Sequence, residues 1–205
     1  KFDKETIAID VHTEEKGDFS FANDEGIRRS TTLEKLATLK PAFKEDGKIT
    51  AASSSQISDG SAAILLASKA AVEKYGLKPR AKIVSMATAG VDPTIMLTAP
   101  IGATRKALDR AGLSVDDLDA IELNEAFASQ VLACTKALGF KDEDYERLNP
   151  NGSGISLGHP VGATGVRILT TMLYEMERRE ARYGLETMCI GGGQGLAAIF
   201  ERVAD

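Results

Sequence analysis

Residues Asn151–Arg167 read NGSGISLGHPVGATGVR and place a single histidine, His159, between glycine-rich flanks. Gly158 is free to adopt a positive φ or to let a neighbouring backbone approach closely, and Pro160 restricts His159 to an extended conformation. The imidazole is therefore presented by a stiff turn. A histidine held in this way is a candidate for acid–base chemistry, although a histidine in a glycine- and proline-containing loop can also be a turn residue and nothing more.

A helix is expected to begin near Gly162, directly after this turn. Apolar residues recur behind it at spacings of three and four, which predicts one buried helical face made of Val166, Leu169, Leu173 and Met176. The free N–H groups and the positive dipole end of this helix would point towards His159. They favour negative charge nearby and a neutral imidazole.

The composition is that of an ordinary globular chain of 205 residues, 43% apolar and 27% charged. The net charge is −5, and no Lys/Arg-rich run with interleaved aromatics occurs, which argues against nucleic acid as a partner. No apolar run approaches the roughly 20 residues that cross a bilayer, and the first residues do not resemble a signal peptide, so no membrane partner is expected. The two cysteines, Cys134 and Cys189, form neither a metal-binding motif nor a disulfide framework. No metal site is expected, and a reducing, cytoplasmic location fits best.

Strand and helix patterns alternate along the chain. Strands are expected at residues 6–11, 48–51, 80–89, 120–123, 186–190 and 196–200, and helices at residues 31–39, 59–75, 100–110, 124–138 and from 162 onward. The segment after residue 11 is expected to be an exposed loop that carries a solvated His12. The helix at 59–75 is rich in Ala, Ile and Leu nearly all round and should be largely buried. The order predicts an α/β layered domain with its sites on strand-to-helix turns.

Two further turns carry polar groups. Asn124 follows the strand at 120–123 and is the expected N-cap of the next helix. Cys189 ends a strand and precedes the run Gly191–Gly195, GGGQG. Serial glycines let N–H groups converge on an anion, but such a run can equally be a tight turn between two strands. Cys134 lies on an apolar helix face and is expected to be a small buried hydrophobe.

Histidine, cysteine and asparagine on separate turns suit thiol or acyl chemistry, in which the histidine takes a proton and N–H groups hold an oxyanion. The sequences Asn124–Phe127 (NEAF), Gly158–Pro160 (GHP) and Cys189–Gly193 (CIGGG) resemble the NEAF, GHP and CxGGG motifs of the thiolases, in the family's order. Together with the polar run before Asp59 and Gly60, the match covers almost the whole chain, and three motifs in register are far more specific than any one of them.

The resemblance implies a thiolase-like half-domain, a mixed sheet with helices on both faces, preceded by a partial loop domain. Thiolases have two similar halves, and this chain resembles the later part: residues 1–50 would be the end of the loop domain that binds coenzyme A, and residues 51–205 the C-terminal domain. In the family the acyl-accepting cysteine lies in the N-terminal half. This chain alone should therefore be inactive, needs that half on the same or a separate chain, and would expose an apolar face without it. A dimer or tetramer is also implied.

The family's site residues carry over onto four positions. His159 would activate the nucleophilic cysteine of the other half and help to bind the thioester oxygen. Cys189 would be the second acid–base group, Asn124 would hold a water that completes one oxyanion hole, and the N–H of Gly191 would contribute to the other. These roles suit the enolate-like leaving group that forms when a carbon–carbon bond next to a carbonyl is cleaved.

Coenzyme A would be a co-substrate, with no tightly bound cofactor. By resemblance, Arg28 would meet its nucleotide end, and the pantetheine tunnel would be lined by Phe43, Ala51, Ser55, Ala126 and Phe127. The run Ala52–Ser58, ASSSQIS, departs from the family's commoner pattern because Gln56 stands where glycine is frequent. This departure suggests an acyl chain bulkier than acetoacetyl, such as a steroid side chain.

The expected activity is CoA-dependent cleavage of 3-ketoacyl-CoA to acyl-CoA and acetyl-CoA, as in fatty-acid β-oxidation, or the reverse condensation. The alternative is a non-catalytic, thiolase-like subunit that binds acyl-CoA or acts as a scaffold. Retention of all three polar motif groups favours the enzyme, because a binding module has no need for His159 and Cys189 together. A ketoacyl synthase fits less well because those enzymes usually place histidine where Cys189 stands.

Overall fold

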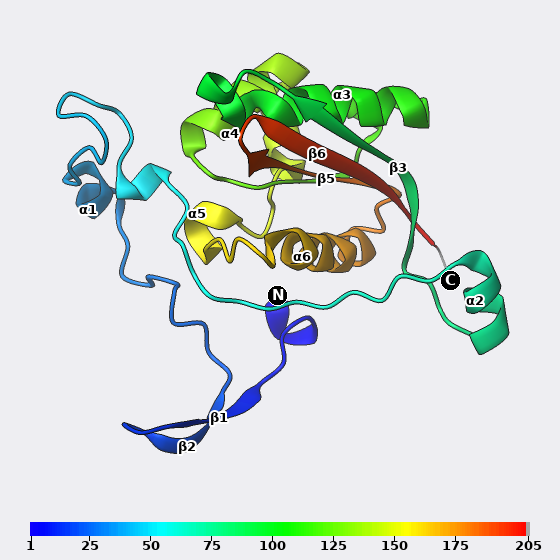
Figure 1. Cartoon of the computed structure of the whole chain (residues 1–205), viewed down its shortest axis with the longest axis horizontal. Helices are drawn as coiled ribbons and strands as arrows, with labels where there is room; N and C mark the ends of the chain where they lie inside the picture. The colour runs from blue at the N-terminus through cyan, green and yellow to red at the C-terminus, as the bar shows by residue number, and fades with distance from the viewer. Residues whose placement is uncertain (204–205) are drawn as a thin grey trace.

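The fold is built on a four-stranded mixed sheet in the computed structural model, which describes residues 1–203 (Figure 1). The strand order is β3-β6-β5-β4, where β3 is Ala81–Gly90, β4 is Ala120–Leu123, β5 is Tyr183–Gly191 and β6 is Gln194–Arg202. The β4–β5 pair is parallel and the other two pairs are antiparallel. Helices α3 (Ala99–Ala111) and α4 (Ala128–Leu138) lie on one side of the sheet and α6 (Thr164–Arg178) on the other. The predicted α/β class with helices on both faces is confirmed.

Alternation along β4 explains how one short strand serves both layers, because successive side chains point to opposite faces. Ile121 belongs to the core under α3, together with Leu185 and Ala103. Ala120 belongs to the core under α6, where Met172 and Met176 are fully buried. Glu122 shares the α6-facing side with Ala120 and is 1% exposed. An ionisable side chain is thus buried on this side of the sheet, and burial raises the pKa of its carboxyl group well above the usual 4.5.

The segment before residue 51 is more regular than expected. The strand predicted at 6–11 is β1 (Ile9–Thr13), which forms a hairpin with β2 (Gly17–Phe21). The prediction of a loop after residue 11 is therefore wrong. Helix α1 (Leu33–Ala37) is capped by Thr32, whose side chain accepts a hydrogen bond from the N–H of Lys35. The strand predicted at 48–51 is wrong: Thr50 instead caps a 3-10 turn at Ala51–Ser53 and makes one isolated bridge. The β1–β2 hairpin, helix α1 and the 3-10 turn lie apart from the four-stranded sheet (Figure 1).

The long buried helix predicted at 59–75 is also wrong. Only Lys69–Tyr75 is helical (α2), ended by Gly76 with a φ of 60°. The preceding residues run extended along the molecule, and Leu65 and Leu66 are 80% and 72% exposed. An apolar run of this length is compatible with a buried strand as well as a helix, and periodicity alone does not separate the two.

The later helices and strands follow the predictions closely. The strand expected at 80–89 is β3, the helix at 100–110 is α3 with Gly112 as a left-handed C-cap, and the strands at 186–190 and 196–200 are β5 and β6. Three short 3-10 segments lie between these later helices and strands, at Pro93–Thr98, Val115–Asp117 and Asp142–Arg147. The helix expected from residue 162 is α6, which begins at Thr164 and is preceded by the one-turn α5 (Gly154–Leu157).

The buried face of α6 differs from the predicted one. The side chains that pack on the sheet are Ile168, Met172 and Met176, whereas Leu169 and Leu173 are only partly buried and line a surface groove. Of the four residues predicted for the buried face, Met176 is confirmed, whereas Val166, Leu169 and Leu173 are only partly buried and form a second, outer apolar stripe. Two stripes are expected of a helix that packs against a second layer on its outer side.

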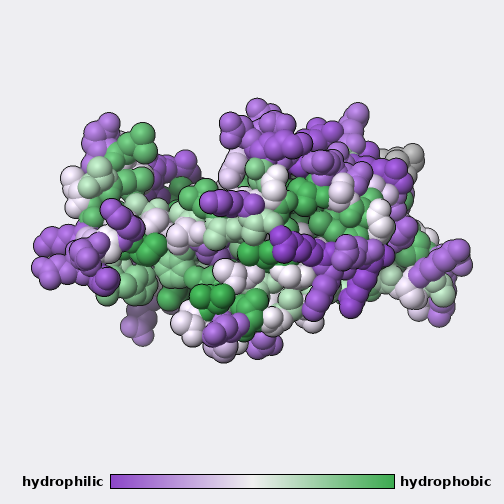
Figure 2. Space-filling model, turned by 90° about the horizontal axis from the view of Figure 1, so that it is seen from above, coloured by the Kyte–Doolittle hydropathy of each residue, from purple (hydrophilic) through white to green (hydrophobic). Residues whose placement is uncertain are grey.

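The surface mixes apolar and charged groups. Figure 2 shows the face seen from above, where apolar groups lie among charged ones. Exposed large apolar side chains include Ile57, Leu65, Val161 and Leu132. Within residues 1–203, none of the helices has the length and apolar character needed to span a membrane.

Candidate active site

The turns that carry Asn124, His159 and Cys189 lie at the same end of the sheet. Asn124 directly follows β4, and Cys189 lies near the end of β5, the parallel neighbour of β4. The start of α6 lies against the end of β5, since a Cβ placed on Gly165 would be 3.8 Å from the sulfur of Met188. Figure 1 shows α5, the start of α6 and the β5–β6 turn at this end. Carboxyl ends of parallel strands are where α/β folds build their sites.

The ring of His159 is half-buried and its orientation is fixed by Thr164. Nδ1 lies 2.6 Å from Oγ1 of Thr164, and the threonine hydroxyl donates to the carbonyl of Pro160 at 2.9 Å. Because the only hydroxyl hydrogen goes to that carbonyl, Nδ1–H is the donor to the threonine oxygen. The neutral ring then keeps its lone pair on Nε2, which is the atom free to accept a proton.

Burial lowers the pKa of His159 below its usual 6.5, and the positive charge of Arg167 lowers it further. Both effects disfavour the imidazolium form. The ring is therefore neutral at pH 7 and available as a base. This agrees with the neutral imidazole expected at the start of a helix, although burial is the larger cause.

Asn124 is not the N-cap that the sequence suggested. Helix α4 begins only at Ala128, and its N-cap is Phe127, which has no side-chain cap bond. The backbone N–H of Asn124 still donates to the carbonyl of Thr187, as in a strand. Its side chain is fully buried, and within residues 1–203 neither its oxygen nor its nitrogen has a hydrogen-bond partner. A buried amide in this condition is available to bind a water or a substrate oxygen.

The two cysteines have different surroundings, and both are free thiols. Cys134 is fully buried and packs with Leu123 and Val131, so the prediction of a small buried hydrophobe is confirmed. Cys189 is half-buried at the end of β5. Burial raises the pKa of the Cys189 thiol, which is therefore protonated at pH 7 and suited to donate a proton.

The glycine run after Cys189 is a tight turn between β5 and β6, and glycine is required there for two reasons. Gly191 has a φ of +123° with open space around the position of a Cβ, so its backbone conformation demands glycine. At Gly195 the φ is ordinary, but a Cβ would come within 2.6 Å of the backbone of Ala99. The turn is thus packed tightly against the start of α3.

The segment Ser54–Gly60 connects the Asn124 turn to the His159 turn through its backbone. The N–H of Ser55 donates to the carbonyl of Ala126 at 3.0 Å, and Ser54 forms an isolated bridge with Phe127. Further along, the carbonyl of Gln56 accepts from the N–H of His159 at 2.7 Å. No local pattern in the sequence indicates that Gln56 holds the backbone of the histidine.

The six residues expected to contact coenzyme A also come together on this segment and beside it. The ring centroids of Phe43 and Phe127 are 5.9 Å apart in an edge-to-face arrangement. The N–H of Ser55 donates a hydrogen bond to the carbonyl of Ala126, and Ala51 is the first residue of the 3-10 turn that precedes Ser55. The guanidinium of Arg28 donates to the side-chain oxygen of Gln56. Gln56, the departure from the family pattern, is therefore the residue that ties Arg28 to the rest of the group.

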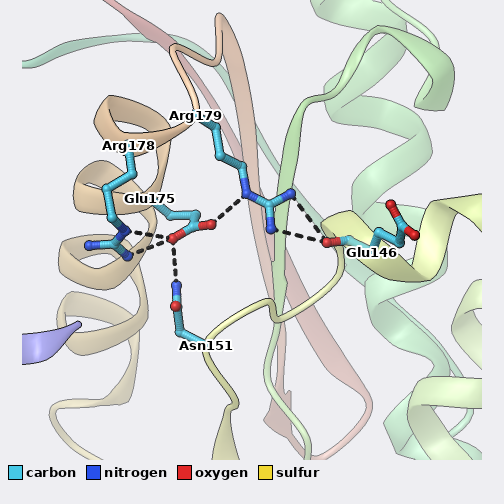
Figure 3. Close-up of polar contacts among 5 residues, drawn as sticks. All are labelled: Glu146, Asn151, Glu175, Arg178 and Arg179. Atoms are coloured by element: carbon cyan, nitrogen blue, oxygen red, sulfur yellow. Dashed lines mark hydrogen bonds and ion pairs between the residues drawn. The ribbon is translucent and has the colours of Figure 1, made fainter.

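The start of the Asn151–Arg167 stretch is anchored to the last turns of α6 by Glu175 (Figure 3). One oxygen of Glu175 accepts from the amide of Asn151 at 2.9 Å and from Arg178 at 2.6 Å, and the other accepts from Arg179 at 2.5 Å. Arg179 also donates to the carbonyl of Glu146. Burial alone would raise the pKa of Glu175, but the hydrogen bonds from Asn151, Arg179 and Arg178 lower it from 4.5 to about 2.

No metal centre is built into this part of the chain. Within residues 1–203 there is no group of three or more His, Cys, Asp or Glu side chains arranged to hold a metal ion.

Known proteins resemble this chain in both sequence and fold. The sequence model described as "Thiolase, C-terminal domain" matches residues 77–202, and that described as "Thiolase, N-terminal domain" matches residues 1–70. The chain is 52% identical over 201 residues to β-ketothiolase BktB of Cupriavidus necator, covering 98% of this chain and 50% of the relative. It is 54% identical over 185 residues to 3-ketoacyl-CoA thiolase of Klebsiella pneumoniae, covering 90% of this chain and 48% of the relative.

Solved structures give the same result. The crystal structure of Bacillus anthracis acetyl-CoA acetyltransferase superposes with a TM-score of 0.93 at 43% identity, over 98% of this chain and 50% of that one. Human mitochondrial 3-ketoacyl-CoA thiolase in complex with CoA gives a TM-score of 0.82 at 40% identity, over 90% of this chain and 46% of that one. The chain thus spans about half the length of the curated relatives it matches.

Proposed function

The chain belongs to the thiolase family, and we propose that it supplies the C-terminal part of the active site of an acyltransferase. The proposed enzyme uses coenzyme A to cleave 3-ketoacyl-CoA to acyl-CoA and acetyl-CoA, or catalyses the reverse condensation. One observation carries the proposal: Asn124, His159 and Cys189 lie on turns at one end of the sheet, and His159 keeps a free Nε2. A protein that only binds acyl-CoA has no need of this combination. Names of relatives, such as 3-ketoacyl-CoA thiolase, support the same reaction class.

In the proposed mechanism, Nε2 of His159 takes the proton of a nucleophilic cysteine from the N-terminal half and then donates a hydrogen bond to the thioester oxygen. The cysteine attacks the 3-keto carbon, the bond between that carbon and the α-carbon breaks, and the Cys189 thiol gives its proton to the α-carbon, which leaves as an enolate. When CoA–SH attacks the acyl-enzyme, it gives its proton to the Cys189 thiolate, and the nucleophilic cysteine leaves and takes its proton back from His159. The free amide of Asn124 holds a water at one oxyanion, and the N–H of Gly191 serves the other. Fixed donors of this kind act where charge develops in the transition state, and each removes several kcal/mol at most from the barrier.

We propose that the surface groove beside α6 is where the remaining part of an N-terminal thiolase half packs. The groove has a volume of about 1040 Å³ and is lined by the outer stripe of α6, by the extended residues 63–68, by α2 and by the start of β3. Apolar side chains in an open groove indicate an interface. The match of the N-terminal family model to residues 1–70 favours this occupant, because the extended segment belongs to that match.

We further propose that residues 1–50 are the end of the loop domain that binds coenzyme A, and that residues 51–205 form the C-terminal domain. All strands of the four-stranded sheet lie after residue 50. Coenzyme A is then a co-substrate, bound near Arg28 and beside the pair of rings that Phe43 and Phe127 form. The assembled enzyme, meaning this chain together with an N-terminal half on the same or a separate polypeptide, is expected to be a dimer or tetramer that works in the cytoplasm.

The activity test compares the chain alone with the assembled enzyme. Consumption of acetoacetyl-CoA in the presence of coenzyme A should be absent for the chain alone and present for the assembly, with the mass of the native complex measured in parallel. A folded assembly that contains the nucleophilic cysteine and binds coenzyme A, yet does not turn over, would instead establish the non-catalytic acyl-CoA-binding subunit.

The substrate test uses the same assembly. Because Gln56 replaces the glycine that is frequent in the family, we expect a higher kcat/KM for bulky 3-ketoacyl-CoAs, of the steroid side-chain type, than for acetoacetyl-CoA. About one order of magnitude is expected, since a few apolar groups in a pocket contribute on the order of 1–3 kcal/mol to discrimination. A preference for the shortest substrate rejects this assignment and leaves the reaction class intact.

A further inference from the structure

Glu125 is the neighbour of Asn124, and its carboxylate bridges two separate turns. One oxygen accepts a hydrogen bond from the side-chain amide of Asn149 at 3.1 Å, and the other accepts from the backbone N–H of Ile155 at 3.1 Å. Ile155 is the second residue of α5, which leads through Gly158 into His159. One side chain therefore contacts both the turn that carries Asn124 and the turn that leads to the histidine.

Asn149 is itself fixed to the free edge of β4. Its side-chain oxygen accepts from the N–H of Leu123 and its amide nitrogen donates to the carbonyl of Leu123, both at 2.8 Å. Its backbone N–H donates to the carbonyl of Ile121 at 2.8 Å, and its φ is +45°, which is unusual for a residue other than glycine. The amide cannot rotate by 180° without losing both bonds to Leu123. Its nitrogen is thus a permanent donor towards Glu125.

The chemistry of this bridge requires a carboxylate. Both groups that face Glu125 are N–H donors, and only a side chain with two acceptor oxygens satisfies both. A glutamine would turn an NH₂ group towards one of the two donors. An aspartate has the charge but is one methylene shorter, so it reaches one partner and not both.

The two turns are packed too closely for the bridge to be replaced by a loose contact. A Cβ placed on Gly154 would lie 3.0 Å from the carbonyl oxygen of Glu125 and 3.1 Å from the side-chain oxygen of Asn124. The backbone that enters α5 therefore touches Asn124 itself. A shift of this turn moves Asn124 and His159 relative to each other.

We propose that Glu125 is a positioning residue, whose carboxylate couples the Asn124 turn to the His159 turn and sets their relative placement. The inference rests on the proposed function for its effect on rate, but the coupling itself is a property of this chain. Misplacing reacting groups by about 1 Å costs on the order of 10²-fold in rate, so a lost bridge should appear in kcat. Substrate affinity should change little, because the partners of the Glu125 carboxylate are Asn149 and Ile155, and neither is an expected coenzyme A residue.

The test is Glu125→Gln, with Asp117→Asn as a matched control. Asp117 is also a carboxylate that accepts two donors, the N–H and the hydroxyl of Ser114, but it caps a remote 3-10 turn. In the assembled enzyme, Glu125→Gln is expected to lower kcat by about 10- to 100-fold with KM for coenzyme A within about threefold, whereas Asp117→Asn keeps kcat. Glu125→Asp is the second variant, in case the glutamine disturbs folding, and is expected to lower kcat to a smaller extent.

A second readout needs no activity. The chain has two histidines, so NMR of the ring carbons of the 205-residue chain gives one signal from His159 and one from the exposed His12 as an internal reference. Glu125→Gln should shift the His159 signal and leave the His12 signal in place, and Asp117→Asn should shift neither. An unmoved His159 signal, or a kcat within twofold of the parent, overturns the proposal. If the parent assembly is inactive, the proposed function is refuted but the role of Glu125 is not. The NMR comparison then shows whether Glu125 couples the two turns.

Discussion

Replacing His159 by asparagine is expected to lower kcat of the assembled enzyme by about 10³-fold, within the 10²- to 10⁴-fold range of general acid–base catalysis. Asparagine is chosen because its amide nitrogen occupies the position of Nδ1 and keeps the donor to Oγ1 of Thr164. The substitution therefore removes Nε2 while it preserves the local hydrogen bond. A large loss of rate without loss of fold would assign the base to Nε2.

The matched control is His12→Asn, in the exposed hairpin where His12 contacts Asp18 at 2.7 Å. The chemical change is the same, and no effect on kcat is expected. If the His159→Asn enzyme keeps more than about one tenth of the parental kcat, His159 is only a turn residue and another group is the general base.

The pH profile provides an independent check on His159. Burial and then Arg167 lower the pKa of the ring below 6.5, and a general base works only in its neutral form. The acid limb of kcat/KM should therefore have its midpoint below 6.5, with full activity at pH 7. His159→Asn should abolish this limb in the residual activity, and a midpoint above 6.5 would contradict the assigned environment of the ring.

The sequence alone was enough to propose the three candidate site residues, because each is marked by the local pattern around it. Asn124 directly follows a strand, His159 precedes a helix and Cys189 lies near the end of a strand, and such strand and helix ends are recognisable from local patterns. The contacts that join these turns are long-range: Glu125 and Ile155 are 30 residues apart, and Asn149 and Leu123 are 26 apart. No local periodicity indicates which donor a carboxylate will meet across such distances.

Two errors in the predicted fold have a common physical cause. The run at residues 61–68 was assigned to a buried helix, and the outer stripe of α6 was assigned to the buried face, although both lie beside the open groove. Apolar composition reports that a surface is buried in the working protein, and not which partner buries it. Both segments fit burial by the N-terminal half that we propose, which explains why the pattern is apolar where the chain itself leaves it exposed.

Replacing Glu175 by glutamine is expected to lower the free energy of unfolding of the chain by about 1–3 kcal/mol, the usual cost of losing hydrogen bonds to a charged group. The carboxylate is 5% exposed and joins Asn151, Arg178 and Arg179, so the amide leaves at least one of these donors unpaired. The two arginines are 33% and 37% exposed and remain hydrated, which keeps the cost below that of a fully buried pair. For about 200 residues this corresponds to a Tm lower by roughly 3–10 °C in a thermal scan.

The pH dependence of this effect has a defined sign. The pKa of Glu175 is lowered from 4.5 to about 2, so its contribution is fully present above pH 4.5 and is lost as the pH falls towards 2. Glu175→Gln should therefore flatten the stability curve over that window and leave its shape above pH 5 unchanged. Glu177→Gln on the same helix is the control, because Glu177 is 46% exposed in its pair with Arg80 and an exposed pair contributes about 1 kcal/mol or less. Equal losses of stability in the two variants would mean that the Glu175 cluster is only a surface ion pair and does not anchor the stretch that begins at Asn151.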